Sequence, residues 1–225
     1  MEILYEDNHI VAVNKNNSDI VQGDKTGDEP LSEKVKTYIK EKYEKPGAVF
    51  LGVIHRLDRP VSGALLFAKT SKALTRMNNM FSEKEVTKTY WAIVKERPLK
   101  ESDTLNHYIV RDQKKNKSFA YDKEKKDSKL ASLSYKLVAY SDNYSLLEVD
   151  LHTGRHHQIR CQLAKIGCSI KGDLKYGFPR SNPDGGISLH SRKIEFIHPV
   201  KKEKVTVVAD PPKDSLWDYF MSTLS

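Results

Sequence analysis

Short apolar or alternating runs, many of them joined by tight turns, constrain the fold of this sequence more than any other feature. These runs predict strands over residues 3–5, 9–14, 49–54, 63–68, 86–94, 133–140, 144–151, 188–196 and 204–208. Apolar residues at helical spacing predict fewer helices, over residues 30–43, 71–82, 156–166 and 215–221, the second of them capped by Ser71. We therefore expect an α+β protein with a mixed, mostly antiparallel central sheet and flanking helices, rather than a doubly wound parallel sheet.

The composition is typical of a soluble globular protein. Hydrophobic residues make up 38% of the 225 positions, and no stretch approaches the roughly 18 continuous apolar residues that a membrane span needs. Because the sequence has no internal repeat and no linker rich in Pro, Gly or Ser, we expect a single domain over residues 1–225. The N-terminus resembles neither a secretory signal nor a transit segment, which favours a cytoplasmic location.

Positive charge is concentrated in one segment. The chain has 38 Lys and Arg against 30 Asp and Glu, a formal net charge of +8, and residues 111–129 hold eight basic residues against four acidic ones. We call residues 111–130 the basic arm. It is either a solvated hairpin or loop whose charge keeps the chain soluble, or a flexible arm that meets phosphates, with Phe119 and Tyr121 available to stack on bases.

Arginine, unlike lysine, gathers in two windows, residues 55–63 and 152–160, which hold four of the nine Arg. Arg is suited to bidentate carboxylate and phosphate contacts, so this clustering indicates a site. In the first window Asp58 lies between Arg56 and Arg59. Nearby guanidinium groups favour its charged form, which makes it a poor proton donor but a competent nucleophile. A salt bridge that only pins the loop is the alternative interpretation.

The second window combines a permissive Gly154 with a cluster of basic and imidazole side chains. Arg155 and His156 are predicted to begin a helix, whose free N–H groups and added positive charge favour an anion. Three histidines raise the question of zinc, but no Cys-x-x-Cys pair or group of carboxylates accompanies them, so we expect no metal. His157 and Arg160 lie one turn apart and would point into the same space.

These segments resemble the signatures of a known family. HRLDRPVSGALLFAKT and LHTGRHHQIRCQLAKIGCSIKGDLKYG are similar to the two signature segments of the RluA-type pseudouridine synthases, and KTYWAIV looks like that family's intervening tyrosine motif. DNHIVAVNK and SLHSRKIEFIHPV resemble its first strand pair and a late strand. The resemblance spans residues 3–208 and implies the pseudouridine synthase catalytic fold.

The resemblance implies an isomerase that converts a uridine within ribosomal or transfer RNA to pseudouridine without a metal or organic cofactor. Asp58 would be the nucleophile, attacking either C1′ of the ribose or C6 of the base. Tyr90 would lie against the uracil and remove a proton, and Arg160 would pair with Asp58. Arg56 would fill the space left by a flipped base or hold a phosphate. The predicted substrate-binding residues are His55, Arg56, Arg59, Lys114, Lys115, Lys117, Arg155, His157 and Gln158.

The chain departs from the family pattern at three places. Val61 stands where the family usually has Thr, and NNSDIVQGD follows Lys15 where the family commonly continues Pro-Ala-Gly. The match begins at residue 3, so we expect no small RNA-binding domain of the S4 kind before the catalytic region. The basic arm then becomes the leading candidate for additional contact with RNA.

RNA is accordingly the expected partner. No membrane is expected, because no apolar stretch is long enough to span one. DNA is not expected either, because no helix-turn-helix or zinc-finger pattern is present. A monomer is the simplest expectation. The main alternative is a non-catalytic RNA-binding or RNA-folding protein on the same fold. Intact Asp58, Tyr90 and Arg160 argue against it, because a degenerate enzyme is expected to have lost at least one of them.

Overall fold

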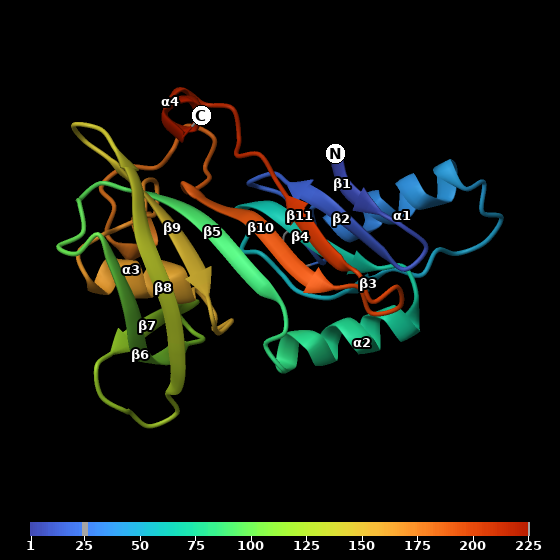
Figure 1. Cartoon of the computed structure of the whole chain (residues 1–225), viewed down its shortest axis with the longest axis horizontal. Coiled ribbons are helices and arrows are strands. Elements are labelled where there is room, and N and C mark those ends of the chain that lie inside the picture. Colours follow the sequence, from blue (N-terminus) through green and yellow to red (C-terminus); the bar gives the residue numbers. More distant parts are fainter. Residues whose placement is uncertain (24–26, 225) are drawn as a thin grey trace. The chain divides into compact units, whose positions relative to one another are not determined.

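A computed structural model describes residues 1–23 and 27–224 of the chain. The chain divides into two compact units, and each is formed by two stretches of sequence. The first unit comprises Met1–Val86 and Ser191–Asp210, and the second comprises Thr87–His190 and Pro211–Ser225. In both, antiparallel strands carry helices against them (Figure 1). The predicted fold class, α+β with a mixed, mostly antiparallel sheet and flanking helices, is confirmed.

The first unit is built around strands β2 and β4. Its described elements are β1 (Glu2–Glu6), β2 (Ile10–Lys15), α1 (Leu31–Lys42), β3 (Gly52–Val53), β4 (Ser62–Ala68), α2 (Ser71–Ser82), most of β10 (Leu189–Ile197) and β11 (Lys204–Val208). Antiparallel pairs join β1 to β2, β2 to β4, β3 to β4 and β10 to β11.

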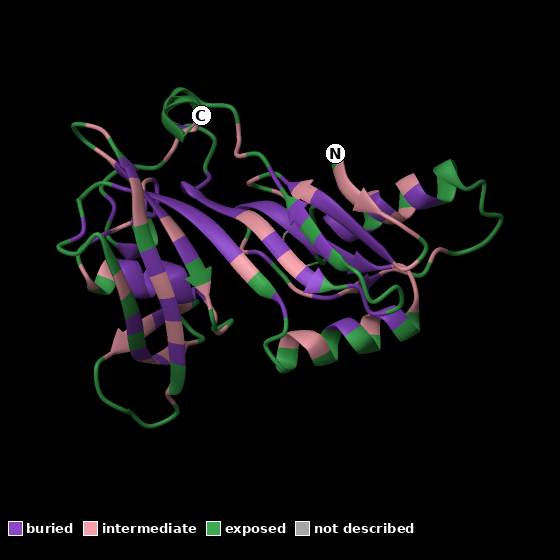
Figure 2. Cartoon of the chain, viewed as in Figure 1, coloured by how far each residue is buried: buried purple, intermediate pink, exposed green. Residues whose placement is uncertain are grey.

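Strands β2 and β4 are covered on both faces, and every residue of β4 is buried (Figure 2). Ala12 and Leu66 pack in one apolar cluster with Met77 of α2. Successive side chains of a strand point to opposite faces, so Val13 and Leu65 line the other face, where they are also fully buried. The continuous apolar run GALLFA is therefore explained by burial on both sides.

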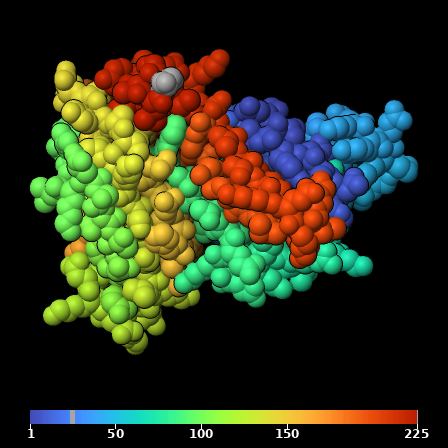
Figure 3. Space-filling model, viewed as in Figure 1, coloured from blue at the N-terminus to red at the C-terminus, as the bar shows by residue number. Residues whose placement is uncertain are grey.

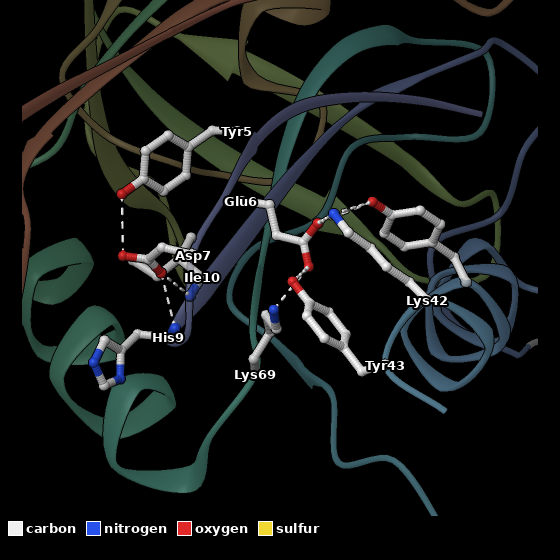
Figure 4. Close-up of polar contacts among 9 residues, drawn as sticks. Tyr5, Glu6, Asp7, His9, Ile10, Lys42, Tyr43 and Lys69 are labelled. Atoms are coloured by element: carbon white, nitrogen blue, oxygen red, sulfur yellow. Dashed lines mark hydrogen bonds and ion pairs between the residues drawn. The ribbon is translucent and has the colours of Figure 1, made fainter. Parts of the chain in front are cut away.

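A polar cluster ties β1 to α1 and to the residue after β4 (Figure 4). The carboxylate of Glu6 accepts hydrogen bonds from Lys42 Nζ at 2.6 Å, Lys69 Nζ at 2.7 Å, and the hydroxyls of Tyr38 and Tyr43, both at 2.9 Å. Burial raises the pKa of the Glu6 carboxyl, but these hydrogen bonds outweigh that effect and lower the pKa to about 2. Glu6 therefore stays ionised and fixes this end of the unit across the neutral pH range.

The second unit has the strand order β5-β9-β8-β6-β7. Its elements are β5 (Thr87–Val94), β6 (Ser102–Asp112), β7 (Lys117–Tyr121), β8 (Lys129–Tyr140), β9 (Ser145–Leu151), α3 (Gln158–Lys165), the 3-10 helix η1 (Leu174–Tyr176), α4 (Ser215–Leu224) and the first residues of β10. Helix α3 packs against β6, β7 and η1 (Figure 1), and six of its eight residues are buried. Helix α4 buries Trp217 and Phe220 in a cluster with Trp91 and Leu146.

The structure differs most from the sequence-based expectation in residues 102–130, where we predicted no strand. Residues 102–112 form β6 and residues 117–121 form β7, and the two pair as a hairpin. Leu105, His107 and Ile109 of β6 are buried. Because His107 is polar, the sequence lacks the regular alternation of apolar and polar residues that predicts a strand. The basic arm is therefore a hairpin followed by a loop over residues 122–128.

Smaller corrections concern where elements begin and end. Thr70, not Ser71, caps α2, because its Oγ1 accepts the N–H of Ala73 at 3.1 Å. Helix α3 begins at Gln158 rather than residue 156, because His157 has a left-handed backbone with φ 53°. Strand β3 covers only Gly52–Val53 of the predicted 49–54. In the part of the chain that the structure describes, no helix is long and apolar enough to span a membrane.

Candidate active site

The first window lies on the loop between β3 and β4 in the first unit. Leu57 is buried and anchors this loop, whereas Arg56 and Arg59 are exposed and Asp58 is half-buried. The carbonyl of Asp58 accepts the N–H of Val61 at 3.0 Å, which closes a turn. The loop thus presents a carboxylate between two exposed cations, as the sequence predicts.

Two predicted RNA-contacting residues of this window have partners inside the first unit. Arg59 Nη2 lies 2.8 Å from Asp28 Oδ2, and both side chains are exposed. Such a pair contributes little to stability and leaves the guanidinium able to exchange its carboxylate for a phosphate. The Nε2 of His55 accepts the N–H of Leu66 at 3.1 Å, and its ring stacks on Phe81 with centroids 5.1 Å apart. These contacts give His55 a part in holding the loop on β4.

A buried lysine that we did not single out from the sequence holds the turn of this loop. Lys15, the last residue of β2, is fully buried, and its Nζ donates to the carbonyls of Asn16 at 2.9 Å, Arg59 at 3.0 Å and Val61 at 2.7 Å. Burial lowers the pKa of Lys15 to about 8, and the charge of Asp58 acts in the opposite direction. Lys15 therefore fixes the main chain on both sides of Pro60 while placing a positive charge near Asp58.

The end of the window has no room for a side chain at one position. Gly63 has φ 115°, and a Cβ there would lie 2.4 Å from the carbonyl oxygen of Ser191 and 2.5 Å from its nitrogen. Both the backbone conformation and this close approach require glycine. Val61, which departs from the family pattern, is 3% exposed, so its apolar side chain suits its surroundings.

The other two predicted catalytic residues belong to the second unit. Tyr90 is a buried residue of β5 and lies opposite Val149 of β9. Arg160, in α3, forms a bidentate pair with Asp173, with Nε to Oδ2 at 2.6 Å and Nη2 to Oδ1 at 2.9 Å. Both side chains are almost completely buried. Asp173 therefore orients the guanidinium and balances its charge.

The rest of the second window divides into exposed and buried residues. Arg155 is exposed, and its Nε donates to the carbonyl of Leu130 at 3.1 Å. Gln158 is buried, and its Oε1 accepts the hydroxyl of Thr153 at 2.8 Å and the N–H of Arg155 at 2.9 Å. His157 is also buried, with Nδ1 2.9 Å from the hydroxyl of Tyr176. Gln158 and His157 thus hold the window together, while Arg155 faces solvent.

The lysines of the basic arm occupy two different surroundings. Lys114 and Lys115 are exposed in the turn between β6 and β7, and Lys117 at the start of β7 is half-buried, with Nζ 5.1 Å from the ring centroid of Tyr176. Lys125 and Lys126 belong to the loop that follows β7 and are exposed. Figure 3 shows the yellow-green segment that contains the basic arm at the lower end of the second unit's visible face. The hairpin borders the second window through the side chain of Ser118, which contacts His156, whereas the loop leads to Leu130, whose main-chain carbonyl accepts from Arg155.

The described residues include no group of three or more His, Cys, Asp or Glu side chains arranged to hold a metal ion. The histidines of the second window are engaged in other contacts. His152 Nε2 lies 2.8 Å from the hydroxyl of Ser134, and His156 Nδ1 lies 2.9 Å from that of Ser118.

Comparison with known proteins decides the family. A family model described as RNA pseudouridylate synthase matches residues 9–165. The chain belongs to this family. The family predicted from the motifs is thereby confirmed, and so is the enzyme class, because pseudouridine synthases are isomerases.

Relatives of this pseudouridine synthase match nearly the whole chain. It is 32% identical over 240 residues to tRNA pseudouridine synthase C of Haemophilus influenzae, covering 99% of this chain and 97% of the relative. It is 34% identical over 212 residues to ribosomal large subunit pseudouridine synthase C of Rickettsia prowazekii, covering 93% of this chain and 68% of the relative. The solved structure of human RNA Pseudouridylate Synthase Domain Containing 4 matches with a TM-score of 0.79 at 20% identity, over 99% of this chain and 92% of that one, and supports the fold.

Family membership does not test the roles of single residues in this pseudouridine synthase. Asp58 lies in the first unit, and Tyr90 and Arg160 lie in the second, so their joint action stays a prediction. Lys15 and Asp173, which support Asp58 and Arg160, were missed from the sequence. A lysine in the apolar run IVAVNK and the acidic residue of KGDLKYG were the available signals.

Proposed function

We propose that this protein isomerises a specific uridine of ribosomal or transfer RNA to pseudouridine, with Asp58 as the nucleophile. The observation that carries the proposal is the family match over residues 9–165, which includes Asp58 on its anchored loop. One relative is named for transfer RNA and another for the large ribosomal subunit, so both RNA classes are candidates.

In the proposed reaction the Asp58 carboxylate attacks C1′ of the ribose or C6 of the uracil. The bond between C1′ and N1 breaks, the uracil turns, and a new bond forms between C1′ and C5. The proton on C5 leaves to a base, for which Tyr90 is the candidate, and N1 acquires a proton. Asp58 is released when the product forms, so substrate and product have the same atoms. One carboxylate suffices because no water is added, in contrast to the two that glycoside hydrolysis requires.

Binding requires that the target nucleotide leave its stack, which costs a few kcal/mol. We assign the phosphate contacts that compensate this cost to the exposed cations Arg56, Arg59 and Arg155 and to the hairpin lysines Lys114, Lys115 and Lys117. Arg56 is the candidate to occupy the space that the flipped base leaves. His55, His157 and Gln158 act indirectly in this proposal, since their described contacts are to the protein.

We further propose that both units act together as one catalytic domain over residues 1–225, in a cytoplasmic monomer that acts on RNA and not on DNA. The continuous family resemblance supports one domain, and action on cellular RNA fits that location. Light scattering of the purified protein, alone and with RNA, tests the oligomeric state.

Asp58→Asn tests the central claim. We expect it to abolish pseudouridine formation, a loss of at least about 10³-fold, because an amide is not a nucleophile of comparable strength. The measurement is pseudouridine content of total RNA from cells that lack the gene, after incubation with wild type or variant. Circular dichroism and RNA affinity, both expected to be retained, serve as controls.

Two outcomes contradict the proposal. If Asp58→Asn keeps its turnover, Asp58 is not the nucleophile. If the wild type binds RNA but makes no pseudouridine in any RNA of the cell, the chain is the non-catalytic RNA-binding protein that the sequence leaves as the alternative.

A further inference from the structure

Tyr176, the last residue of η1, contacts both the basic hairpin and the second window within the second unit. Its hydroxyl lies 2.8 Å from the backbone nitrogen of Ser118 in β7 and 2.9 Å from Nδ1 of His157. Because the N–H of Ser118 donates to the hydroxyl oxygen, the phenol proton is available to His157. The Tyr176 ring centroid lies 5.1 Å from Arg160 Cζ and 5.1 Å from Lys117 Nζ.

These contacts are shielded from water. Tyr176 is 7% exposed, Ser118 1% and His157 8%. Burial raises the pKa of the Tyr176 phenol well above its usual range, so the hydroxyl keeps its proton. A parallel connection runs from Ser118 Oγ to Nδ1 of His156 at 2.9 Å, and the His156 ring stacks on that of His157 with centroids 3.7 Å apart.

The position of β7 explains why such a connection is needed. Among the strands that the structure describes, β7 is the last in the order of the second unit, so its outward N–H groups have no strand partner there. The Tyr176 hydroxyl supplies the acceptor for one of them, at Ser118. On the other side it bonds His157, whose left-handed backbone costs on the order of 1 kcal/mol and begins the helix that carries Arg160.

We infer that Tyr176 is a positioning residue that fixes the basic hairpin relative to Arg160. An RNA strand whose phosphates bind Lys114 and Lys115 would then be held in register with the second window. The inference rests on the proposed function and deepens it, because it assigns a task to a residue that need not touch RNA. If Tyr176 only stabilised the fold, the hairpin lysines would contribute the same amount to RNA affinity with or without its hydroxyl.

A double-mutant cycle on RNA affinity tests the inference. All variants carry Asp58→Asn, so that RNA is bound without being converted. Tyr176→Phe removes the hydroxyl and keeps the ring beside Arg160. It is combined with Lys114→Ala and Lys115→Ala in the hairpin turn or, as a matched control, with Lys125→Ala and Lys126→Ala in the following loop. The probe is the cellular RNA in which the wild type makes pseudouridine or, if it makes none, total cellular RNA.

We expect Tyr176→Phe alone to weaken RNA binding about 5-fold, which is the size of effect that loss of a buried hydrogen bond produces. In the hairpin-neutralised background the loss should shrink to less than about 2-fold, because coupled residues are not additive. In the Lys125→Ala, Lys126→Ala background the full loss should persist. Equal losses in all three backgrounds would overturn the inference and reduce Tyr176 to a stabilising residue.

Ser118→Ala keeps the experiment decisive if Tyr176→Phe fails to fold. It removes the hydrogen bond to His156 and retains the backbone N–H that binds Tyr176, and it should show the same dependence on background with a smaller factor. If the wild type makes pseudouridine and the losses are equal, only this inference fails. If the wild type binds RNA without converting it, the proposed function fails, and the cycle still decides the role of Tyr176. No RNA binding at all would overturn both.

Discussion

The two arginine-rich windows are held by different kinds of contact. In the first unit, one buried lysine, Lys15, donates to three main-chain carbonyls of or beside the loop that carries Asp58. In the second unit, side chains hold one another, with Asp173 against Arg160 and Tyr176 against His157. A contact with carbonyls fixes the path of a loop whatever side chains the loop bears. A contact between side chains fixes the identity of both partners.

The difference also concerns charge. The carboxylate of Asp173 balances the Arg160 guanidinium, whereas the described hydrogen bonds of the Lys15 ammonium are to neutral carbonyls. Burial accordingly lowers the pKa of Lys15 to about 8, within reach of ordinary working conditions. We expect the first window to respond to pH and the second to respond mainly to substitution.

The largest effect is expected from Asp173→Ala. Removing one partner of a buried ion pair leaves the Arg160 charge without its bidentate carboxylate, so the free energy of unfolding should fall by about 3–5 kcal/mol. Asp173→Asn, which keeps the shape and one acceptor, should cost less. Urea denaturation at pH 7 measures both.

A matched control for that variant is Asp122→Ala. Asp122 pairs with Lys165 at 2.8 Å in the same unit, but it is exposed, so its loss should lower the free energy of unfolding far less than the loss of Asp173 does. Similar costs for the two variants would show that the Asp173 pair is no stronger than a surface pair. The conclusion that a strong side-chain pair holds the second window would then be wrong.

Much of the fold could be predicted, because its signals are local. The apolar run of β4 and the alternating run of β9 lie between turn residues, and both strands were found. β6 was missed because His107 occupies one of its buried positions, where Gln162 Nε2 lies 3.0 Å from its Nδ1. That partner is 55 residues away in the sequence, so no window of neighbouring residues shows that the histidine is accommodated.

In the candidate site, too, the residues in local clusters could be singled out from the sequence, whereas those that support them from a distance could not. Asp58 and Arg160 stand out because they lie in dense clusters of chemically informative residues. Lys15 and Asp173 lie 43 and 13 positions away from the residues they support, and their roles arise only when strands and helices pack. The predicted start of the helix at residue 156 was wrong for a related reason. His157 has a left-handed backbone, which local preference opposes, and its side chain bonds the distant Tyr176.

A smaller and pH-dependent effect is expected from Lys15→Met. At pH 7 the loss of donors to three carbonyls should lower the free energy of unfolding by about 1–2 kcal/mol, after the relief of a buried charge is subtracted, and should reduce turnover. The pKa of Lys15 is lower in the folded chain than its usual 10.5, so the unfolded chain binds more protons between about pH 8 and 10.5. The contribution of Lys15 to stability therefore rises across that range.

The measurement is the difference in unfolding free energy between the wild type and Lys15→Met, taken at several pH values from 7 to 10.5. Most other groups titrate alike in both proteins and cancel in this difference. A difference that stays constant with pH would mean that burial does not destabilise the Lys15 ammonium. The two windows would then differ in the kind of contact that holds them but not in their response to pH.

The smallest effect is expected on the salt dependence of RNA binding, and it should differ between the hairpin and the loop of the basic arm. If the contacts of Ser118 with Tyr176 and His156 fix the hairpin more firmly than the loop over residues 122–128, the hairpin lysines meet phosphates in a more defined way than Lys125 and Lys126. Lys114→Ala with Lys115→Ala should then lower the salt slope of RNA binding, the change in log affinity per log salt concentration, by about 2, one for each lost phosphate contact. Lys125→Ala with Lys126→Ala removes the same charge and should change the slope by less than about 0.5. Equal changes in the two pairs would mean that the arm acts through its net charge and that its attachment to the second window has no part in RNA binding.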